Sequence, residues 1–582
     1  MPVNNFKAIF TLLIFLIAEF LVIFPVYIPI PKRFSRSWKQ EKRPINGLGD
    51  VDPVPQSYRI PLDFRTAPFI AVLLLLASEC IHGAEVRKGI VGSDGVEPLN
   101  VMALFISLAY MVISIDHAGL LRFLAFWVAC QSGTSGIRLY SSICTFFFVL
   151  GVIVGNDPVI LSGVPFLAYF TQETGIDPPT AWIFAQFIIA NIASAVLVSS
   201  NPTNLVLSGA FSISFFTYTA KIIVPVISAA VFMLPLLLLI FRDPKFIPRR
   251  LTPITLSPRS VLVDPFGGIF GATILILTLC ALVSTSFLHP QVYLVTVPPA
   301  VIVFLRDIVH DIRGYRTRNQ ESQCRTDQEK TMDDTNPRST SAIRDSGADI
   351  THDTTADATI LDYPEVESKH NQRDNKNLVT STPAGDDRLT QGEISEKCVE
   401  TQSSKLDTLR SMFPNVLIIL RLMPFSLVVF SFSMFILVQG LAVTGWVDVW
   451  AGWWSQWVAH TGTVGSIFGM GLISCILCNV FGTNIGATIL LARILQVWIQ
   501  SRDPHPRIKD GAIYALALGS NYGAFTFSFP ASLAGLLWKR LLMQKEIIVT
   551  MPQFARLNFI PVAVAMGVSS AVLIGQVYII HR

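Results

Sequence analysis

Residues 152–161 read Val-Ile-Val-Gly-Asn-Asp-Pro-Val-Ile-Leu, so the polar triplet Asn156-Asp157-Pro158 interrupts an otherwise apolar run. Three other polar groups interrupt apolar runs in the same way. They are Ser-Ser-Asn-Pro-Thr-Asn at 199–204, Cys-Asn-Val-Phe-Gly-Thr-Asn at 478–484 and Gly-Ser-Asn-Tyr-Gly at 519–523. The order and spacing of these four breaks predict the fold more directly than the apolar segments between them.

The composition places these apolar runs in a membrane. Of the 582 residues, 51% are apolar and 14% are charged, whereas a soluble domain carries roughly 25% charged residues. The charges are also uneven, since 15 Lys/Arg and 21 Asp/Glu lie between Arg306 and Arg410. We therefore expect a polytopic membrane protein with one large polar insert. This excludes a soluble enzyme, a nucleic-acid-binding protein and a secreted disulfide scaffold, and the sequence shows no catalytic, metal-binding or cofactor motif.

The four breaks form two matched pairs. Asn156 lies 45 residues before Asn201, and Asn479 lies 42 residues before Asn521. A glycine precedes each pair at a similar distance, 37 residues in the first half and 34 in the second. If the basic segments all face the cytoplasm, the first break must lie in a hairpin that opens inward and the third in one that opens outward. We therefore predict an all-α inverted repeat with two re-entrant hairpins and two broken helices.

A helix break at membrane depth creates a place for a ligand. A half-helix that starts at a break presents free N–H groups and a positive dipole end, and one that stops there presents carbonyls. Asn, Ser and Thr side chains complete such a shell, and two matched pairs of breaks indicate a transport site. The candidate substrate- or ion-binding residues are Asn156, Asp157, Ser200, Asn201, Thr203, Asn204, Asn479, Thr483, Asn484, Ser520 and Asn521.

Asp157 is the only carboxylate at the four breaks. A carboxylate at hydrocarbon depth costs at least ~3 kcal/mol, so it is rarely kept without a partner or a role. We interpret it as a carboxylate that couples transport to a proton or a cation. It also fits as a cap for the first N–H groups of the returning hairpin arm, and the two roles are compatible. Each lone Asn at a break is likewise consistent with plain interhelical hydrogen bonding.

The basic segments also divide the chain. The insert lacks hydrophobic periodicity and is rich in Asp, Thr, Ser, Arg and Asn, so we expect it to be disordered and cytoplasmic. The predicted organisation is a first membrane helix with a basic cytoplasmic segment (1–60), a first transporter repeat with linking helices (61–305), the insert (306–412) and a second transporter repeat (413–582).

Several stretches resemble the arsenical-pump (arsenite efflux) membrane permease family. Residues 519–523, followed by Ser-Leu-Ala-Gly-Leu-Leu-Trp at 532–538, are similar to that family's most recognisable signature. Pro424–Gly445 resembles the segment that opens its second half, and Asn156-Asp157 resembles its first hairpin tip. The chain departs from the family at Asn521, where the family usually has Asp.

This resemblance implies the citrate-transporter-like fold of the ion-transporter superfamily and a secondary active antiporter that exchanges protons for arsenite or antimonite. The close alternative is a sodium- or proton-coupled transporter of inorganic or carboxylate anions. An alternative of another class is a non-transporting membrane receptor or scaffold. The implied partners are a small inorganic oxyanion or metalloid, H⁺ or Na⁺ as the coupling ion, and the lipid bilayer, and a homodimer is left open. We expect a multi-pass protein of the plasma membrane or an endomembrane, with no enzyme activity and no cofactor.

Overall fold

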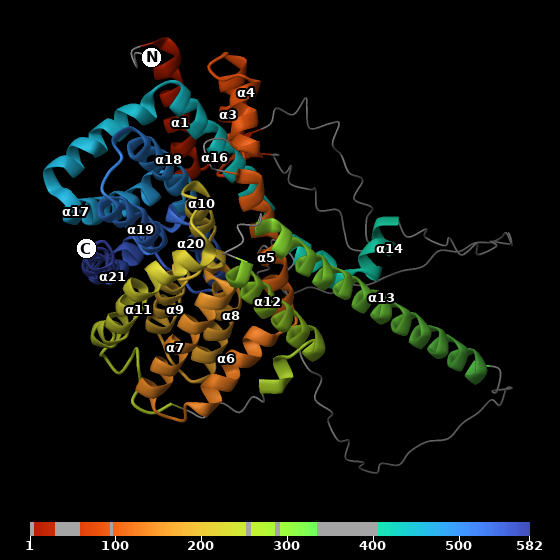
Figure 1. Cartoon of the computed structure of the whole chain (residues 1–582). Helices are drawn as coiled ribbons and strands as arrows, with labels where there is room; N and C mark the ends of the chain where they lie inside the picture. Colours follow the sequence, from red (N-terminus) through yellow and green to blue (C-terminus); the bar gives the residue numbers. More distant parts are fainter. Residues whose placement is uncertain (1–4, 30–58, 93–96, 252–257, 286–291, 334–404) are drawn as a thin grey trace, which may run out of the picture. The chain divides into compact units, whose positions relative to one another are not determined.

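The structure, a computed structural model, describes residues 5–29, 59–92, 97–251, 258–285, 292–333 and 405–582. Apart from one two-stranded sheet, the regular structure of these residues is helical (Figure 1). Nine helices within the described ranges are long and apolar enough to cross a membrane. The prediction of an all-α polytopic membrane protein is therefore confirmed.

The elements follow one another along the two halves of the chain. The first half contains α1 (Phe6–Ile23), β1 (Val26–Pro29), β2 (Arg59–Leu62), α3 (Ala67–Ala77), α4 (Gly83–Val91), α5 (Pro98–His117), α6 (Leu120–Gln131), α7 (Gly136–Val154), α8 (Asn156–Glu173), α9 (Thr180–Ala193), η2 (Val198–Ser200), α10 (Pro202–Ala210), α11 (Phe215–Ile240), η3 (Pro258–Val261), α12 (Pro265–Thr285) and α13 (Val292–Asp333). The second half contains α14 (Lys405–Met412), α15 (Pro414–Leu422), α16 (Phe425–Val443), α17 (Trp446–Val480), α18 (Asn484–Arg502), α19 (Pro506–Tyr522), η4 (Gly523–Phe525), η5 (Phe529–Ala531), α20 (Leu533–Gln544) and α21 (Met551–Ile580). Strands β1 and β2 pair antiparallel, with Val26 opposite Leu62.

All four predicted breaks interrupt helices. Gly155 alone separates α7 from α8, and its φ of 89° lies in the region that favours glycine. A Cβ at Gly155 would stand 2.4 Å from the carbonyl oxygen of Ser200, so a close backbone approach also requires glycine there. Three residues, including Gly482 at φ 59°, separate α17 from α18. The other two breaks are the short η2 turn between α9 and α10 and the η4–η5 segment between α19 and α20.

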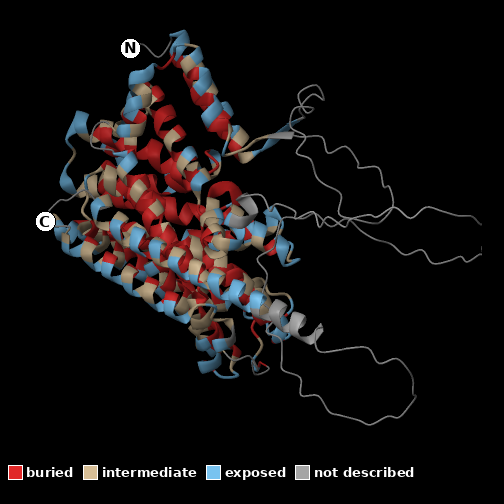
Figure 2. Cartoon of the chain, turned by 90° about the vertical axis from the view of Figure 1, so that its right-hand side faces the viewer, coloured by how far each residue is buried: buried red, intermediate tan, exposed pale blue. Residues whose placement is uncertain are grey.

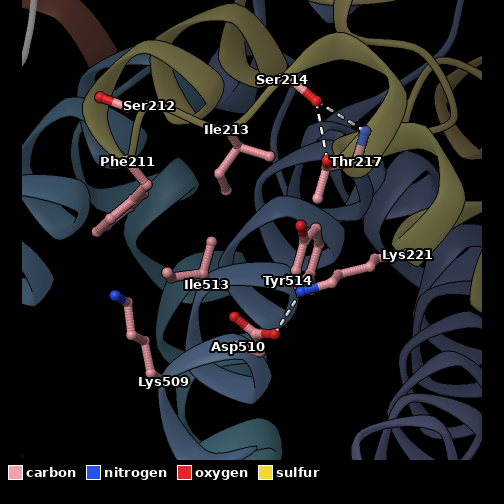
Figure 3. A pocket seen from close by; sticks show the side chains of 10 residues that line it. All are labelled: Phe211, Ser212, Ile213, Ser214, Thr217, Lys221, Lys509, Asp510, Ile513 and Tyr514. Carbon is pink, nitrogen blue, oxygen red and sulfur yellow. Dashed lines mark hydrogen bonds and ion pairs between the residues drawn. The ribbon is translucent and has the colours of Figure 1, made fainter. Parts of the chain in front are cut away.

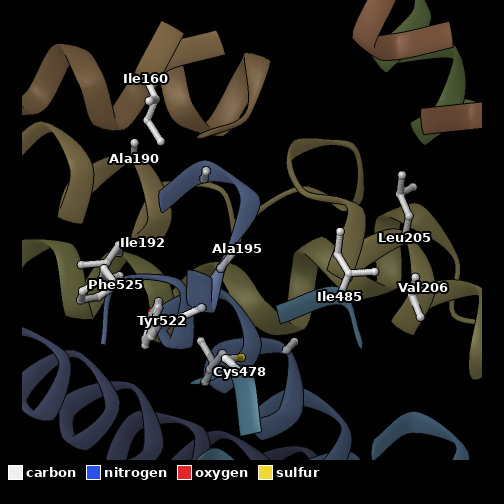
Figure 4. Packing of buried hydrophobic residues seen from close by; sticks show 14 of the residues in the cluster. Ile160, Ala190, Ile192, Ala195, Leu205, Val206, Cys478, Ile485, Tyr522 and Phe525 are labelled. Atoms are coloured by element: carbon white, nitrogen blue, oxygen red, sulfur yellow. The ribbon is translucent and has the colours of Figure 1, made fainter. Parts of the chain in front are cut away.

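The helices beside the breaks form the core. Every residue from Ala181 to Ala193 in α9 and from Gly511 to Tyr522 in α19 is buried, which is expected of helices that are apolar on all faces. Figure 2 shows the buried residues concentrated in the centre of the helical body, with exposed residues on its outer helices. Figure 4 shows the apolar packing near the breaks, where the rings of Tyr522 and Phe525 are 6.1 Å apart at their centroids.

Helices of the two halves pack against each other throughout this core. α20 packs on α8, α10 packs on α18, and α11 packs on α21. Trp538 of α20 lies against Phe184 and Phe187 of α9, with ring centroids 5.3 and 4.9 Å away. Each half therefore buries apolar surface that the other half covers.

The chain divides into two compact units. One consists of Met1–His310 together with Asn415–Arg582, and the other consists of Asp311–Pro414. α13 continues past residue 306 as far as Asp333, and residues 405–412 form α14. Residues 306–333 and 405–412 of the predicted insert are thus described as helical. α13 is anchored where the insert was expected to begin, because Asp307 accepts hydrogen bonds from Tyr110 (2.9 Å) and Ser114 (2.8 Å) of α5. The remaining expectation of disorder, at 334–404, lies outside the described residues.

Candidate functional site

The two broken helices meet through side-chain amides. Asn521, in the last turn of α19, donates a hydrogen bond from Nδ2 to Oδ1 of Asn204 over 2.7 Å. Its Oδ1 accepts a hydrogen bond from Nδ2 of Asn201 over 2.9 Å. The three residues are at most 2% exposed. This amide cluster (Asn201, Asn204 and Asn521) therefore joins the two halves of the chain at the points where both helices are interrupted.

Capping of α10 orients one member of the amide cluster. Asn201 is the N-cap residue, and its Oδ1 accepts hydrogen bonds from the N–H (3.1 Å) and the hydroxyl (3.0 Å) of Thr203. Pro202 follows at the first helical position, where its missing N–H costs nothing. With its oxygen used by the cap, Asn201 has its Nδ2 group left to reach Asn521.

Ser194 extends the amide cluster, although the sequence analysis did not identify it. Its hydroxyl donates to Oδ1 of Asn521 (3.2 Å), and its carbonyl accepts from Nδ2 of Asn204 (2.7 Å). Ser194 is the C-cap residue of α9, so the broken helix contributes both its ending and its restarting half to the cluster. A single Ser in an apolar segment is too common to be selected from the sequence.

The α7–α8 break is fastened to the first broken helix. The hydroxyl of Ser200 donates to the carbonyl of Val152 at the end of α7. Asn156 donates from Nδ2 to Oδ1 of Asn191 in α9 over 2.9 Å, and Asn191 donates in turn to the carbonyl of Phe187 (2.8 Å). Asn191 is a second polar residue that the sequence analysis missed. Asn156 and Ser200 thus lie beside the amide cluster rather than in it.

The α17–α18 break is fastened to the second broken helix. Oδ1 of Asn479 accepts hydrogen bonds from the N–H (3.1 Å) and the hydroxyl (2.9 Å) of Ser528, and its Nδ2 donates to the hydroxyl of Thr526. Thr483 is the N-cap residue of α18, with its hydroxyl oxygen accepting from the N–H of Gly486 (3.1 Å). The hydrogen bonds of Asn479 and Thr483 therefore hold this break in place.

The two remaining second-half candidates are buried near these groups. Asn484 is the first residue of α18 and is 3% exposed. Ser520 precedes Asn521 in α19, and its hydroxyl donates to the carbonyl of Ala517 in the same helix over 3.2 Å. Ser520 therefore bonds to its own helix instead of the amide cluster.

Asp157 differs from the other candidates. It lies in the first turn of α8, directly after Asn156, and it is only partly buried. Within the described part of the chain its carboxylate makes no hydrogen bond or ion pair. The start of a helix favours a negative charge, so the position of Asp157 suits a carboxylate.

A cavity of about 400 Å³ lies where α10 ends and α11 and α19 begin (Figure 3). Lys221 and Asp510 form an ion pair on its lining, with Nζ and Oδ2 2.5 Å apart. Asn521 follows Tyr514, which also lines the cavity, by seven residues on α19, a distance of about 10 Å along the helix. The cavity thus ends about two helical turns short of the amide cluster.

The amide cluster has no formal charge. It presents amide N–H groups, carbonyl oxygens and hydroxyls, so it can both donate to and accept from a small polar molecule. The described residues contain no group of three His, Cys, Asp or Glu side chains placed to hold a metal ion. The chemistry that this arrangement supports is reversible binding of a small polar molecule.

Comparison with known families gives two matches on different parts of the chain. Residues 60–315 match the citrate transporter family, and residues 412–577 match the arsenical pump membrane protein family. The first match includes the α7–α8 break and the first broken helix, and the second includes the α17–α18 break and Asn521.

Individual proteins that resemble this chain are also arsenical pump membrane proteins. The arsenical pump membrane protein of Escherichia coli strain K12 is 29% identical over 210 residues, which cover 35% of this chain and 48% of that protein. The putative arsenical pump membrane protein of Bacillus subtilis strain 168 is 25% identical over 186 residues, covering 31% and 41%. The chain spans about half the length of the curated relatives that it matches. Among solved structures, the crystal structure of the Alcanivorax borkumensis YdaH transporter matches with a TM-score of 0.48 and 12% identity, covering 98% of both chains.

Proposed function

Since this chain belongs to the ion transporters of the arsenical-pump and citrate-transporter type, we propose that it is a secondary active transporter with its substrate site between the two broken helices. The observation that carries this proposal is the amide cluster. Interrupted helices are tolerated in a membrane only where they pack in protein or line a cavity, and in transporters they form the substrate site. The hydrogen bonds of Asn521 to Asn204 and Asn201 close the site in this conformation.

Arsenite or antimonite is the substrate that the amide cluster fits best. At neutral pH these metalloids are mainly uncharged molecules that carry several hydroxyl groups. A cluster of amides and hydroxyls pairs such a molecule through both donors and acceptors. Citrate at the same pH is a multiply charged anion, which calls for Arg or Lys partners, and the cluster is built from Asn201, Asn204, Asn521 and Ser194.

Protons are the proposed coupling ion, and Asp157 is the proposed coupling group. Its carboxylate makes no hydrogen bond or ion pair with the described residues that a proton would have to displace. It also lies in the same turn as Asn156, whose hydrogen bond to Asn191 fastens the α7–α8 break to the first broken helix. Protonation of Asp157 would therefore change the charge next to a contact that must loosen when the site opens.

The citrate-like alternative keeps one specific observation in its favour. The cavity at the starts of α11 and α19 is lined by Lys509 and by Lys221, which is paired with Asp510, and both helix starts present a positive dipole end. That surface suits an anion better than an uncharged metalloid. A sodium- or proton-coupled transporter of inorganic or carboxylate anions is thus the second candidate.

Reconstitution separates the two candidates. Purified protein in sealed liposomes is offered radiolabelled arsenite, antimonite, phosphate or citrate under an imposed pH gradient or an imposed sodium gradient. The proposal predicts arsenite and antimonite flux that follows the pH gradient. Flux of citrate or phosphate in their place would select the second candidate.

The proposed arrangement in the membrane follows from the basic segments. We propose transporter repeats at 61–305 and 413–582, with the 306–412 insert on the cytoplasmic side of the plasma membrane or of an endomembrane. The excess of Lys and Arg near the ends of the apolar segments supports this orientation.

A further inference from the structure

Glu19 is a carboxylic acid buried inside α1. The residue is 1% exposed, and both carboxyl oxygens are buried. Neither oxygen has a hydrogen-bond partner among the described residues. The face of α1 that carries Glu19 also carries Thr11, Phe15, Ala18 and Val22, all of which are buried. An acid in such a place is a costly feature of a membrane helix and calls for a role.

The buried face of α1 lies against the α17–α18 break. The rings of Phe15 and Phe481 are 5.5 Å apart at their centroids. A Cβ at Gly482 would stand 2.6 Å from Cγ1 of Val22. Glu19 follows Phe15 by four residues and precedes Val22 by three, so it occupies the same face of the helix between these two contacts. Glu19 is therefore enclosed between α1 and its neighbours next to Phe481 and Gly482.

The neighbouring helices supply no cation for this carboxyl group. Helices α3, α16 and α17 pack against α1, and the sequences of α3 and α16 contain no ionisable residue. α17 carries four ionisable residues. The thiols of Cys475 and Cys478 donate to carbonyls of α19, His460 is exposed, and Asp448 lies near the other end of α1, where Trp446 bonds to the Ala8 carbonyl.

Lys7, on α1 itself, is also at the far end, where its amine donates to the carbonyl of Glu79 (2.8 Å). Lys7 precedes Glu19 by twelve residues, about 18 Å along the helix. An ionised carboxylate without a partner or water is strongly unfavourable in such surroundings. Glu19 is therefore held as the neutral acid while α1 is closed on the α17–α18 break.

We propose that Glu19 is a second proton-binding group of the transport cycle, loaded when α1 covers the α17–α18 break and released when that break moves away and admits water. This rests on the proposed function. In the release step the O–H bond of the acid breaks and the proton passes to water, leaving a carboxylate. In the return step a proton from water re-forms that bond before the contacts of Phe15 and Val22 close again.

The position of Glu19 also matches that of Asp157 in the other half. Asp157 lies at the α7–α8 break, and the buried face of α1 that carries Glu19 lies against the α17–α18 break. With Glu19 beside Phe481 and Gly482, each half has one carboxyl group at its first break, and the one in the second half comes from a helix outside the repeat.

The test measures protons and arsenite together in liposomes that contain the full chain and a trapped pH-sensitive dye. Glu19→Gln keeps the shape of the neutral acid but binds no exchangeable proton. It should retain arsenite exchange between the two sides at zero gradient while lowering the proton-to-arsenite ratio by about one. Glu79→Gln is the matched control, because Glu79 is exposed at the other end of the α1–α3 contact, and it should keep the wild-type ratio.

A second measurement covers the case in which Glu19→Gln does not fold. Dicyclohexylcarbodiimide modifies protonated carboxyl groups in apolar surroundings, and mass spectrometry locates the adduct. In the wild-type protein at neutral pH, Glu19 should be modified and Glu79 should not. An unmodified Glu19, or a wild-type proton-to-arsenite ratio in Glu19→Gln, overturns the assignment of Glu19. A wild-type protein that moves no arsenite overturns the proposed function instead.

Discussion

Nδ2 of Asn521 donates a hydrogen bond to Oδ1 of Asn204 over 2.7 Å, although 317 positions separate the two residues in the chain. The same Nδ2 group donates to the carbonyl of Ala517 over 2.8 Å. Both protons of this amide are therefore used, one within α19 and one across to α10. A neutral amide at position 521 completes this arrangement, whereas an ionised carboxylate has no proton to give.

In Asn521→Asp, the hydrogen bonds of the amide cluster should depend on whether residue 521 is protonated. Transport by this variant should consequently depend on pH through the cluster itself, whereas the wild-type cluster contains no titratable group. With an ionised aspartate side chain in this variant, two acceptors face a carboxylate, at a cost of about 1–3 kcal/mol for each unsatisfied group. At low pH the protonated acid regains one donor. Arsenite flux in liposomes should therefore be about tenfold or more below wild type at pH 8 and should recover toward it as the pH falls.

Asn5→Asp is the control for this substitution, because Asn5 is exposed at the start of α1. It makes the same chemical change without touching the cluster and should leave the pH profile unaltered. An Asn521→Asp profile that coincides with the wild-type profile at every pH would show that this amide contact does not matter for transport.

Asp157→Asn should weaken the coupling of transport to the pH gradient. The substitution removes the only carboxylate within the four break sequences themselves and keeps a side chain of the same shape. Uptake driven by a pH gradient should fall to the part that Glu19 still couples, while exchange of labelled for unlabelled arsenite continues in part. Asp448→Asn is a matched control, since Asp448 is likewise in the first turn of its helix but is exposed. If Asp157→Asn retains full pH-driven uptake, Asp157 serves only as a cap for α8 and takes no part in coupling.

Gly155→Ala should destabilise the protein more than Gly133→Ala. Both glycines have positive φ, 89° and 71°, which costs an L-residue roughly 1–2 kcal/mol. Only at Gly155 does the added Cβ also meet backbone, at 2.4 Å from the Ser200 carbonyl oxygen, whereas Gly133 has nothing within 4 Å. Thermal unfolding in detergent measures the difference between the two variants. Equal losses of melting temperature would mean that the α7–α8 break can move away from Ser200 without cost.

Removal of residues 334–404 should leave transport largely intact. The amide cluster and all four breaks lie in the unit formed by Met1–His310 and Asn415–Arg582. The segment 334–404 belongs to the other unit. A short flexible linker in place of the segment should keep arsenite flux within about threefold of wild type. Loss of flux at normal membrane abundance would show that the insert takes part in the mechanism. In the full-length chain, an engineered glycosylation site within 334–404 should stay unmodified if the insert is cytoplasmic.

The positions of the helix breaks could be predicted from the sequence because their cause is local. A polar group with Gly or Pro in an apolar run marks a break wherever it occurs. The partners of each break depend on how distant helices pack, and Ser194, Asn191 and Ser528 had no local signal to distinguish them from other small polar residues. The link from Asn521 to Asn201 and Asn204 could be proposed as a shared site but not as a set of hydrogen bonds.

Glu19 and α13 also depend on contacts between distant segments, which the local sequence does not reveal. The sequence around Glu19 is apolar on all sides of the helix, so periodicity could not tell which face is buried or that Glu19 lies on it. The continuation of α13 into the insert begins at Asp307, which contacts Tyr110 and Ser114, nearly 200 residues earlier in the chain. A polar segment that looks disordered by composition is thus helical where it is anchored to a packed neighbour.

The most direct test of the account is arsenite flux into liposomes that contain the purified chain, measured with a pH gradient alone and with a sodium gradient alone. We predict that wild-type flux follows the pH gradient and ignores sodium, and that the flux of Asp157→Asn responds less to the pH gradient while exchange is retained. Flux that follows sodium and ignores pH, or the absence of arsenite flux from a folded protein that moves citrate, would contradict it.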